Sequence, residues 1–230
     1  MKGIIFTKEN FLLTIKGLKT QTRRIIPEKV IEKFYNYDDR VSSVGKPDGI
    51  ACIRLYEEDF LPQFSRYKVG EIVYLKEPYQ HAIVHEMVGY GYFYGCDKIE
   101  DYSCDLSWFR EMSRDGSSEW QERWNKYEDE KMNKLFMPEI AARYFIKITG
   151  VKAERLQDIS EEDCLLEGIK IGRCGNESKW MKAFYAPDDN QPYITAKSAY
   201  EEVFNRINGK GAWRINPFVW VYDYELTKQF

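Results

Sequence analysis

Residues Gly17–Arg24 read GLKTQTRR and place one amine, two hydroxyl groups and two guanidinium groups within a short stretch that contains no acidic side chain. In an extended segment alternate side chains share a face, so Lys19 is expected on the side opposite Thr20 and Thr22 unless a turn rearranges them. Such a cluster is either a binding surface or a solvated group of charges. The spacing alone leaves its role open.

The residues before this stretch predict that it is held on a fixed support. Residues 2–6 are apolar enough to form a short strand. Thr7 is a suitable N-cap for a helix from about residue 8 to residue 16, and Gly17 supplies its end. Residues 18–24 are therefore expected to leave a helix that is pinned to the core, as an ordered loop or strand.

Patterns farther along the chain predict a substantial β component together with helices. Strands are expected at residues 50–56, 69–77 (after a turn), 90–95, 144–156 and 218–226. Ser160 caps a short predicted helix that ends at Gly168 and has Glu167 as its last residue. Thr195 caps a second helix, which ends at Gly209 and carries apolar residues at helical spacing.

The composition fits one folded core with insertions. At 230 residues the chain can bury a substantial core, and its aromatic share of 16% suits a protein with many strands. The formal net charge is −3 and the pI is about 5.7. These values exclude a protein that coats nucleic acid through a broad basic surface, although a local basic patch stays compatible with them.

The sequence shows no pattern typical of a membrane segment, a signal peptide, a disulfide framework or a metal site. No apolar run reaches the roughly eighteen residues that a membrane helix requires, and the apolar start is too short for a signal peptide. The five cysteines show no close CxxC pairing, and His81 and His85 with Glu86 lack an evident further ligand. We therefore expect a cytoplasmic protein with reduced thiols, no membrane partner, no metal and no cofactor.

Several blocks of the sequence resemble the ASCH family of PUA-like proteins. The family signature Gly-x-Lys-Thr-x-Thr-x-Arg, which follows an N-terminal helix, is matched by Gly17, Lys19, Thr20, Thr22 and Arg24. Other blocks resemble the turn-and-strand segment "GDxLWVRE", the "MP…A.R" entry, the "ERLQDI…EGI" run and the closing "NPWVWV" strand of larger phage-associated members, at residues 70–77, 137–143, 154–169 and 216–221. These blocks follow the family order over about half the chain.

The resemblance implies a fold and a class of ligand. The fold is expected to be α+β, a PUA-like and mostly antiparallel β-barrel with flanking helices, in a single domain over residues 1–230. Large insertions are expected at about residues 28–66, 80–135 and 170–194. The family cleft suits RNA, single-stranded nucleic acid or a modified nucleoside, so recognition of an exposed base is the first expectation. A hydrolase, either an N4-acylcytidine amidohydrolase or a ribonuclease, is the alternative.

The resemblance also implies site residues. In small amidohydrolase members the working residues are a lysine and a threonine of the signature loop and a glutamate on the short helix after the ERL-type strand. Carried over, these are Lys19, Thr22 and Glu167, the predicted catalytic residues. A neutral Lys19 amine would be favoured by burial and by nearby arginines and opposed by a close Glu167. Ligand contacts are expected from Thr20, Arg23, Arg24, Glu77 and Arg143.

Simpler interpretations of the same residues stay open. Lys19 and Glu167 can form an ordinary ion pair with Thr22 bonded to the backbone, and Glu77 can form a salt bridge at the rim of the barrel. Arg143 is either a ligand contact or an exposed residue. The Trp-rich insertion at residues 96–135, with one short helix expected, can anchor onto the core or stack on bases. A third functional class is a phage protein that binds a host protein through this insertion.

Overall fold

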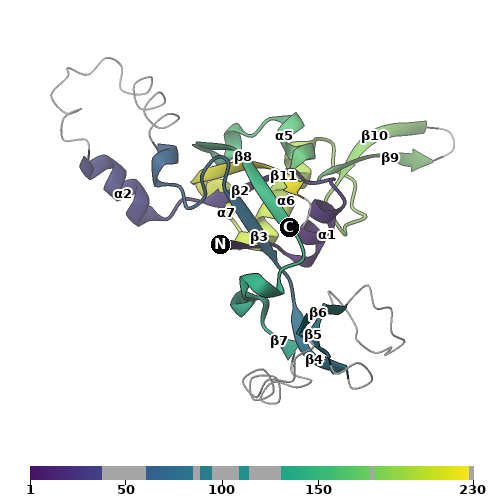
Figure 1. The fold of residues 1–230 in the computed structure, drawn as a ribbon. Coiled ribbons are helices and arrows are strands. Elements are labelled where there is room, and N and C mark those ends of the chain that lie inside the picture. Colours follow the sequence, from purple (N-terminus) through teal and green to yellow (C-terminus); the bar gives the residue numbers. More distant parts are fainter. Residues whose placement is uncertain (38–60, 85–88, 95–108, 114–130, 177–178, 228–230) are drawn as a thin grey trace. The chain divides into compact units, whose positions relative to one another are not determined.

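The structure is a computed structural model that describes residues 1–37, 61–84, 89–94, 109–113, 131–176 and 179–227 (Figure 1). The predicted strand at residues 50–56 and most of the Trp-rich insertion lie outside these residues, as do His85 and Glu86. None of the helices in the described ranges combines the length and the apolar character that a membrane crossing requires.

The chain divides into two compact units. Unit 1 contains Met1–Phe11, Ile72–Ile146 and Thr227–Phe230, and unit 2 contains Leu12–Glu71 and Lys147–Leu226. The helix α1 (Lys8–Ile15) and the strand β8 (Phe145–Arg155) each begin in unit 1 and continue into unit 2. The predicted catalytic residues all belong to unit 2.

Unit 1 is built mainly from strands. They are β1 (Lys2–Ile5), β3 (Ile72–Lys76), β4 (Tyr79–Val84), β5 (Gly89–Tyr94), β6 (Phe109–Ser113) and β7 (Lys131–Met132), with 3-10 helices at Lys134–Phe136 and Glu139–Ala141. β1 runs parallel to β3, which sets the buried Ile4 beside the buried Leu75. β4 to β7 form an antiparallel sheet in the order β6-β5-β4-β7.

Unit 2 combines strands and helices. Its further elements are β2 (Gln21–Ile25), α2 (Glu28–Tyr37), α5 (Glu161–Leu166), β9 (Lys170–Asn176), β10 (Lys179–Tyr185), α6 (Ala196–Asn208), α7 (Ala212–Ile215) and β11 (Phe218–Thr227), with 3-10 helices at Leu61–Phe64 and Leu156–Asp158. β11 pairs antiparallel with β2, and β9 pairs antiparallel with β10. This pairing places the start of β2 beside the end of β11.

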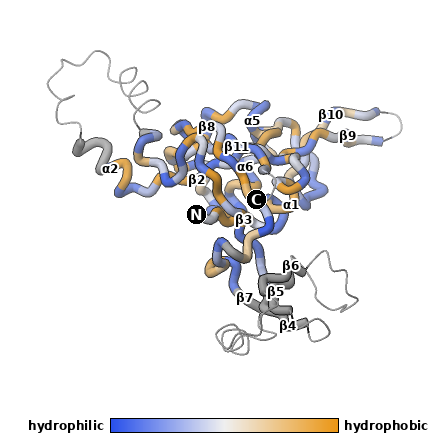
Figure 2. The backbone as a smooth tube through the Cα atoms, in the orientation of Figure 1, coloured by the Kyte–Doolittle hydropathy of each residue, from blue (hydrophilic) through white to orange (hydrophobic). Residues whose placement is uncertain are grey.

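The core of unit 2 lies between β11 and α6. The apolar stripe of α6 is buried, and Tyr200 meets the ring of Trp213 at a centroid distance of 6.2 Å. Val219 and Val221 belong to the same buried cluster. Trp220, whose side chain leaves β11 on the other side, is also buried, so both faces of this strand are covered. Figure 2 shows the mixture of apolar and polar positions along these elements.

Most of the predicted elements are confirmed within the described residues. Thr7 Oγ1 accepts a hydrogen bond from the Asn10 N–H at 3.3 Å at the start of α1, and Gly17 ends the turn with φ at 70°. Thr195 caps α6 with a capping box, and the helix stops at Gly209. The hairpin β9–β10 has no counterpart among the sequence predictions, which assigned these residues only to an insertion.

The α+β class is confirmed, but the predicted closed barrel is wrong. The main sheet is mixed and open, in the order β1-β3-β8-β11-β2, and its edge strands β1 and β2 do not pair with each other in the part of the chain described. A barrel requires hydrogen bonds between the two edges and a matching strand tilt. Just before β2, the Thr20 N–H donates instead to the Leu166 carbonyl at the end of α5. Sequence alternation predicts strands but does not specify this closure.

Candidate functional site

Lys19 lies in a turn that backbone hydrogen bonds hold in place. After Gly17, the N–H of Lys19 donates to the Leu13 carbonyl at 3.3 Å. The N–H of Thr20 then donates to the Leu166 carbonyl at 3.0 Å. Lys19 is thereby fixed between the ends of α1 and α5, and its side chain is only 2% exposed.

Glu167 is positioned by the end of α5. Ser160 Oγ accepts a hydrogen bond from the Asp163 N–H at 3.0 Å, which starts the helix, and the Glu167 N–H donates to the Asp163 carbonyl at 2.9 Å. Gly168 follows with φ at 103°, and a Cβ built there would lie 2.8 Å from a side-chain carbon of Leu13. The positive φ favours glycine at this position, and a Cβ there would also require the Leu13 side chain in α1 to shift.

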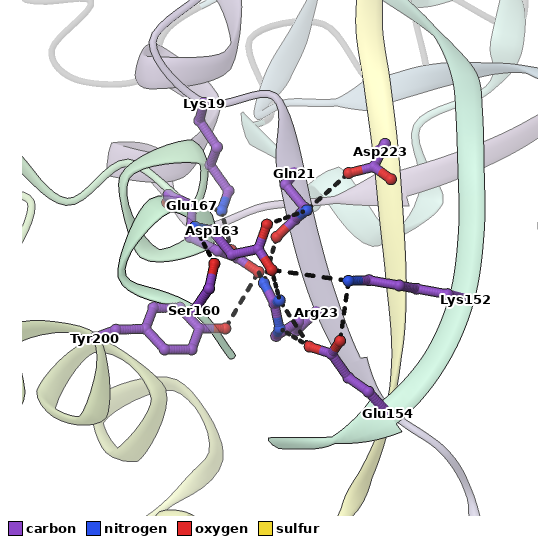
Figure 3. Close-up of polar contacts among 10 residues, drawn as sticks. All are labelled: Lys19, Gln21, Arg23, Lys152, Glu154, Ser160, Asp163, Glu167, Tyr200 and Asp223. Carbon is purple, nitrogen blue, oxygen red and sulfur yellow. Dashed lines mark hydrogen bonds and ion pairs between the residues drawn. The ribbon is translucent and has the colours of Figure 1, made fainter. Parts of the chain in front are cut away.

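Lys19 and Glu167 meet although 148 positions separate them in the sequence (Figure 3). The Lys19 Nζ donates to the backbone carbonyl of Glu167 at 2.8 Å and forms an ion pair with its carboxylate. The two side chains are 2% and 4% exposed. This contact is expected both for a catalytic pair and for an ordinary ion pair. The protonation state of Lys19 is what distinguishes the two interpretations.

The electrostatic surroundings of Lys19 favour the neutral amine. Burial lowers the pKa of Lys19, and the guanidinium groups of Arg24 and Arg23 act in the same direction. The Glu167 carboxylate opposes them through its charge and its hydrogen bond, but the net result is a lowered pKa. The sequence predicted these opposing influences, and the structure supplies the burial that decides between them.

Arg23 is the centre of a buried polar network. Its Nε and Nη2 donate to Glu154 at 2.9 and 2.7 Å, and Nη2 also donates to Asp163 at 3.0 Å. Its Nη1 donates to the side-chain oxygen of Gln21 and to Glu167 at 3.2 Å. Because these contacts use every N–H of the guanidinium group, a ligand contact by Arg23 would require one of them to break.

The charges around Arg23 stabilise one another. Burial by itself would lower the pKa of Arg23, but the negative groups around it, with Glu167 contributing most, raise the pKa above its usual value. Burial would raise the pKa of Asp163, yet hydrogen bonds from Gln21 and Arg23 and the charge of Lys152 hold it below its usual value. The guanidinium group of Arg23 therefore remains a permanent cation beside Glu167.

Tyr200 completes the contacts of the Glu167 carboxylate. Its hydroxyl donates to the same carboxylate oxygen that Arg23 contacts, at 3.2 Å, whereas Lys19 pairs with the other oxygen. Burial and the Glu167 charge raise the pKa of Tyr200 well above its ordinary value. The phenol therefore stays protonated and acts as a hydrogen-bond donor.

Thr22 lies on the face of β2 opposite the network. The strand register pairs Thr22 with Tyr222 and Arg24 with Trp220, whereas the side chain of Arg23 points toward Glu167. Thr22 is 4% exposed, and no hydrogen-bond partner of its hydroxyl is found among the described residues. The structure thus does not place Thr22 in the Lys19–Glu167 contact. The simpler interpretation expects the Thr22 hydroxyl to bond to the backbone, and no such hydrogen bond is found among the described residues either.

The Thr22 face carries further buried hydroxyl groups. Tyr222 shares a hydrogen bond with Ser65 at 2.7 Å, and Tyr224 shares one with Thr14 at 3.0 Å. Burial raises the pKa of Tyr222 to about 12. Thr20 is half-buried at the end of this face, where its backbone carbonyl accepts from the Tyr224 N–H at 2.9 Å.

Glu77 and Arg143, two predicted ligand contacts, bind each other in unit 1. Arg143 Nε and Nη2 donate to the two carboxylate oxygens at 2.9 and 2.5 Å. Glu77 is 1% exposed, and burial raises its pKa although Arg143 opposes this. The salt bridge of the simpler interpretation is therefore present, on an open sheet instead of a barrel rim.

Four residues of the network were missed in the sequence. They are Gln21, Glu154, Asp163 and Tyr200. Gln21 is at a variable position of the family signature, and Glu154 begins the ERL-type block. Asp163 is at the third position after the Ser160 cap, and Tyr200 is on the apolar face of the second predicted helix. One signal was available for Gln21, because alternation in an extended segment places it on the same face as Lys19 and Arg23. No sequence pattern marks which acidic side chains meet them.

Comparison of this chain with family models, with curated proteins and with solved structures finds no match. The resemblance to the ASCH family therefore rests on the quoted motifs and stays a prediction. The function must therefore be inferred from the chemistry of the Lys19–Glu167 contact and of the groups that hold it.

Proposed function

We propose that this protein hydrolyses the amide bond of an acylated nucleobase of the N4-acylcytidine type, with Lys19 as the general base. The observation that carries this proposal is a buried lysine whose pKa is lowered although its amine contacts a carboxylate. A lysine that serves only as an ion-pair partner gains nothing from a neutral form. Groups perturbed by burial and by specific charged partners are typical of active sites.

The proposed reaction divides its work between two side chains, Lys19 and Glu167. The neutral Lys19 amine takes a proton from a water molecule while the water oxygen attacks the amide carbonyl carbon. Glu167 orients the amine and stabilises the ammonium group that forms. The C–N bond then breaks and the leaving nitrogen takes the proton back from Lys19, so amide and water give a carboxylic acid and an amine.

The Arg23 network supports this arrangement by fixing Glu167. Arg23 and Tyr200 hold one carboxylate oxygen at 3.2 Å each, which leaves the other oxygen for Lys19. A general base works best when its partner is held in place before the substrate arrives. Because Lys19 and Glu167 are nearly fully buried, a substrate must first displace the side chains packed over them, and we expect this opening to limit turnover.

The proposal is tested by incubating the purified protein with N4-acetylcytidine and following cytidine by liquid chromatography. Lys19→Met keeps the apolar stem and removes the amine, and we expect a loss of about 100-fold or more in kcat/KM. Lys210→Met, an exposed lysine on the same unit, is the matched control and should leave activity unchanged. Circular dichroism establishes that both variants are folded.

The pH profile gives an independent readout. A base that must be neutral makes kcat/KM rise with pH as Lys19 loses its proton, with an inflection below the ordinary lysine value of 10.5 because its pKa is lowered. Wild-type protein that releases no cytidine, or Lys19→Met protein that keeps the wild-type rate and inflection, would overturn the assignment.

Binding without turnover is a second candidate function. The observation that favours it is the buried Thr22 hydroxyl, which has no hydrogen-bond partner among the described residues and shares its strand face with Tyr222 and Trp220. A hydroxyl beside aromatic rings suits a base that stacks and accepts one hydrogen bond. Calorimetric titration with cytidine and N4-acetylcytidine should then show saturable binding that Thr22→Val weakens, even if no product forms.

A further inference from the structure

The hairpin β9–β10 is a two-stranded ribbon that is anchored at its inner end. Phe184 belongs to the buried cluster of α6, and its backbone exchanges two hydrogen bonds with Tyr193 at 2.9 and 2.8 Å. Toward the tip, Gly175 has φ at 135°, and a Cβ there would lie 2.0 Å from the Lys179 carbonyl oxygen. Figure 1 shows the ribbon extending beyond α5 and α6 of the same unit.

Large apolar side chains are exposed along this ribbon. Ile171, Trp180 and Met181 are 55%, 56% and 55% exposed. The register separates them, because Ile171 lies opposite Phe184 at the inner end and Met181 projects from the face opposite Trp180. Trp180 is therefore the large exposed ring near the tip of the ribbon, and an exposed tryptophan offers a flat surface on which a base can stack. These three side chains are not part of the buried core of unit 2.

The same ribbon carries positive charge, and the Lys182 ammonium group lies 4.9 Å from the centre of the Phe184 ring. Its cations are exposed and form no ion pair among the described residues, namely Lys170, Arg173, Lys179 and Lys182. Its one acidic residue, Glu177, lies outside the described residues. In a chain whose net charge is −3, this segment is locally basic, so its charge complements a polyanion.

The register places an aromatic ring and two cations on one face. Arg173 lies directly opposite Lys182, and Trp180 is two positions from Lys182 on the same strand, so the three side chains share a face. Trp180 lies opposite Gly175, which has no side chain to cover the ring. The ring and the cation pair are therefore separated along the strand by about 7 Å.

We infer that the β9–β10 ribbon binds single-stranded nucleic acid, with Arg173 and Lys182 on the phosphates and Trp180 stacked on a base. Proteins that bind single strands combine a positive surface with aromatic side chains in this way. A single strand is favoured over a duplex because only an unpaired base offers its face to Trp180. This inference rests on the proposed function in one respect, because it assumes that the acylated base is part of a single-stranded nucleic acid.

The test measures fluorescence anisotropy of labelled single-stranded RNA and DNA oligonucleotides at several salt concentrations. Trp180→Ala should weaken binding by about 5- to 150-fold, the range measured for loss of one base–aromatic stack. Replacing both Arg173 and Lys182 by alanine should reduce the slope of log K against log salt by about 1.4, since each phosphate contact on a single strand contributes about 0.7. The matched control, Lys210→Ala with Arg214→Ala, removes the same charge elsewhere on unit 2 and should bind normally.

Three outcomes would overturn the inference. They are absence of binding by wild-type protein, wild-type affinity in both ribbon variants, and an equal loss in the control variant. Binding of polyglutamate as tight as that of the oligonucleotides would replace the nucleic acid by an acidic protein partner. Failure of the proposed function is distinguishable, because Lys19→Met should lose nucleoside turnover while keeping oligonucleotide affinity, and the ribbon variants should do the reverse.

Discussion

Removing the charge of Glu167 is expected to destabilise the protein more than removing the charge of Lys19. The buried Glu167 carboxylate is shared by Lys19, Arg23 and the Tyr200 hydroxyl. Glu167→Gln keeps the volume of the side chain but removes the carboxylate that faces the buried Arg23 cation and the Lys19 amine. Lys19→Met keeps the apolar stem and leaves Glu167 paired with Arg23.

The magnitudes follow from the cost of an uncompensated buried charge. Removing one partner of a buried ion pair costs roughly 3–5 kcal/mol, and we expect Glu167→Gln in this range. For a chain of this length that corresponds to a fall in Tm of about 6–20 °C. Lys19→Met loses one charge-assisted hydrogen bond but also ends the burial of an amine, so we expect a loss below about 2 kcal/mol.

The difference between wild type and Lys19→Met should also depend on pH. The pKa of Lys19 is lowered in the folded state, whereas the unfolded chain has the ordinary value of 10.5. Between these two values the unfolded state binds more protons, so the contribution of Lys19 to stability increases as pH rises toward 10.5 and is lost as pH falls. Lys19→Met cannot show this dependence.

Urea titrations followed by far-UV circular dichroism measure these free energies of unfolding. Glu225→Gln, an exposed carboxylate whose contact with Lys147 is 3.9 Å long, is the control and should change stability by less than about 1 kcal/mol. If Lys19→Met costs as much as Glu167→Gln, the carboxylate is not the shared centre of the network and the reasoning fails.

Three further predictions concern residues around the site and in unit 1. Thr14→Val removes the buried hydrogen bond of 3.0 Å between Thr14 and the Tyr224 hydroxyl and should cost about 1–3 kcal/mol in urea unfolding. Gly168→Ala puts a Cβ at a position with positive φ and against the Leu13 side chain, so the Tm should fall. The control is Gly209→Ala, at an exposed position that also has positive φ but has no atom within 4 Å of an added Cβ, and its Tm should fall by less. Burial raises the pKa of Glu77 in the folded state above the value of 4.5 that it has in the unfolded chain. At pH values between 4.5 and the raised pKa the folded state binds more protons, so the stability due to Glu77 falls as the pH rises. Glu77→Gln should abolish this dependence of Tm on pH in thermal unfolding measured over that pH range.

Local signals in the sequence were sufficient for the elements that carry the site. The cap at Ser160 and the glycine at 168 define α5 and make Glu167 its C-cap, and Gly17 marks the turn from which Lys19 emerges. Each of these signals acts within a few residues through backbone geometry and side-chain capping. They are therefore readable without knowledge of the rest of the chain.

The network could not be read in this way, because its partners come from separate parts of the chain. Glu154 lies in β8, Asp163 in α5 and Tyr200 in α6, and each reaches the Arg23–Glu167 contact only when β2 is packed against these elements. The apolar spacing of α6 predicts a buried face, which includes Tyr200, but it carries no information about the partner of the Tyr200 hydroxyl. The same limit applies to β9–β10, whose glycines and mixed polarity weaken the strand signal.

The sequence by itself predicted α1, α5, α6, β8 and β11 to within a few residues, and its resemblance to a known family identified Lys19 and Glu167 as candidate site residues. The tertiary structure alone decided that the sheet stays open and that these two residues share one buried contact. It also decided that Thr22 faces away from that contact. The physical reason is that helix caps and strand alternation depend on neighbours in the chain, whereas strand order, burial and the pKa of a buried amine depend on groups that only folding brings together.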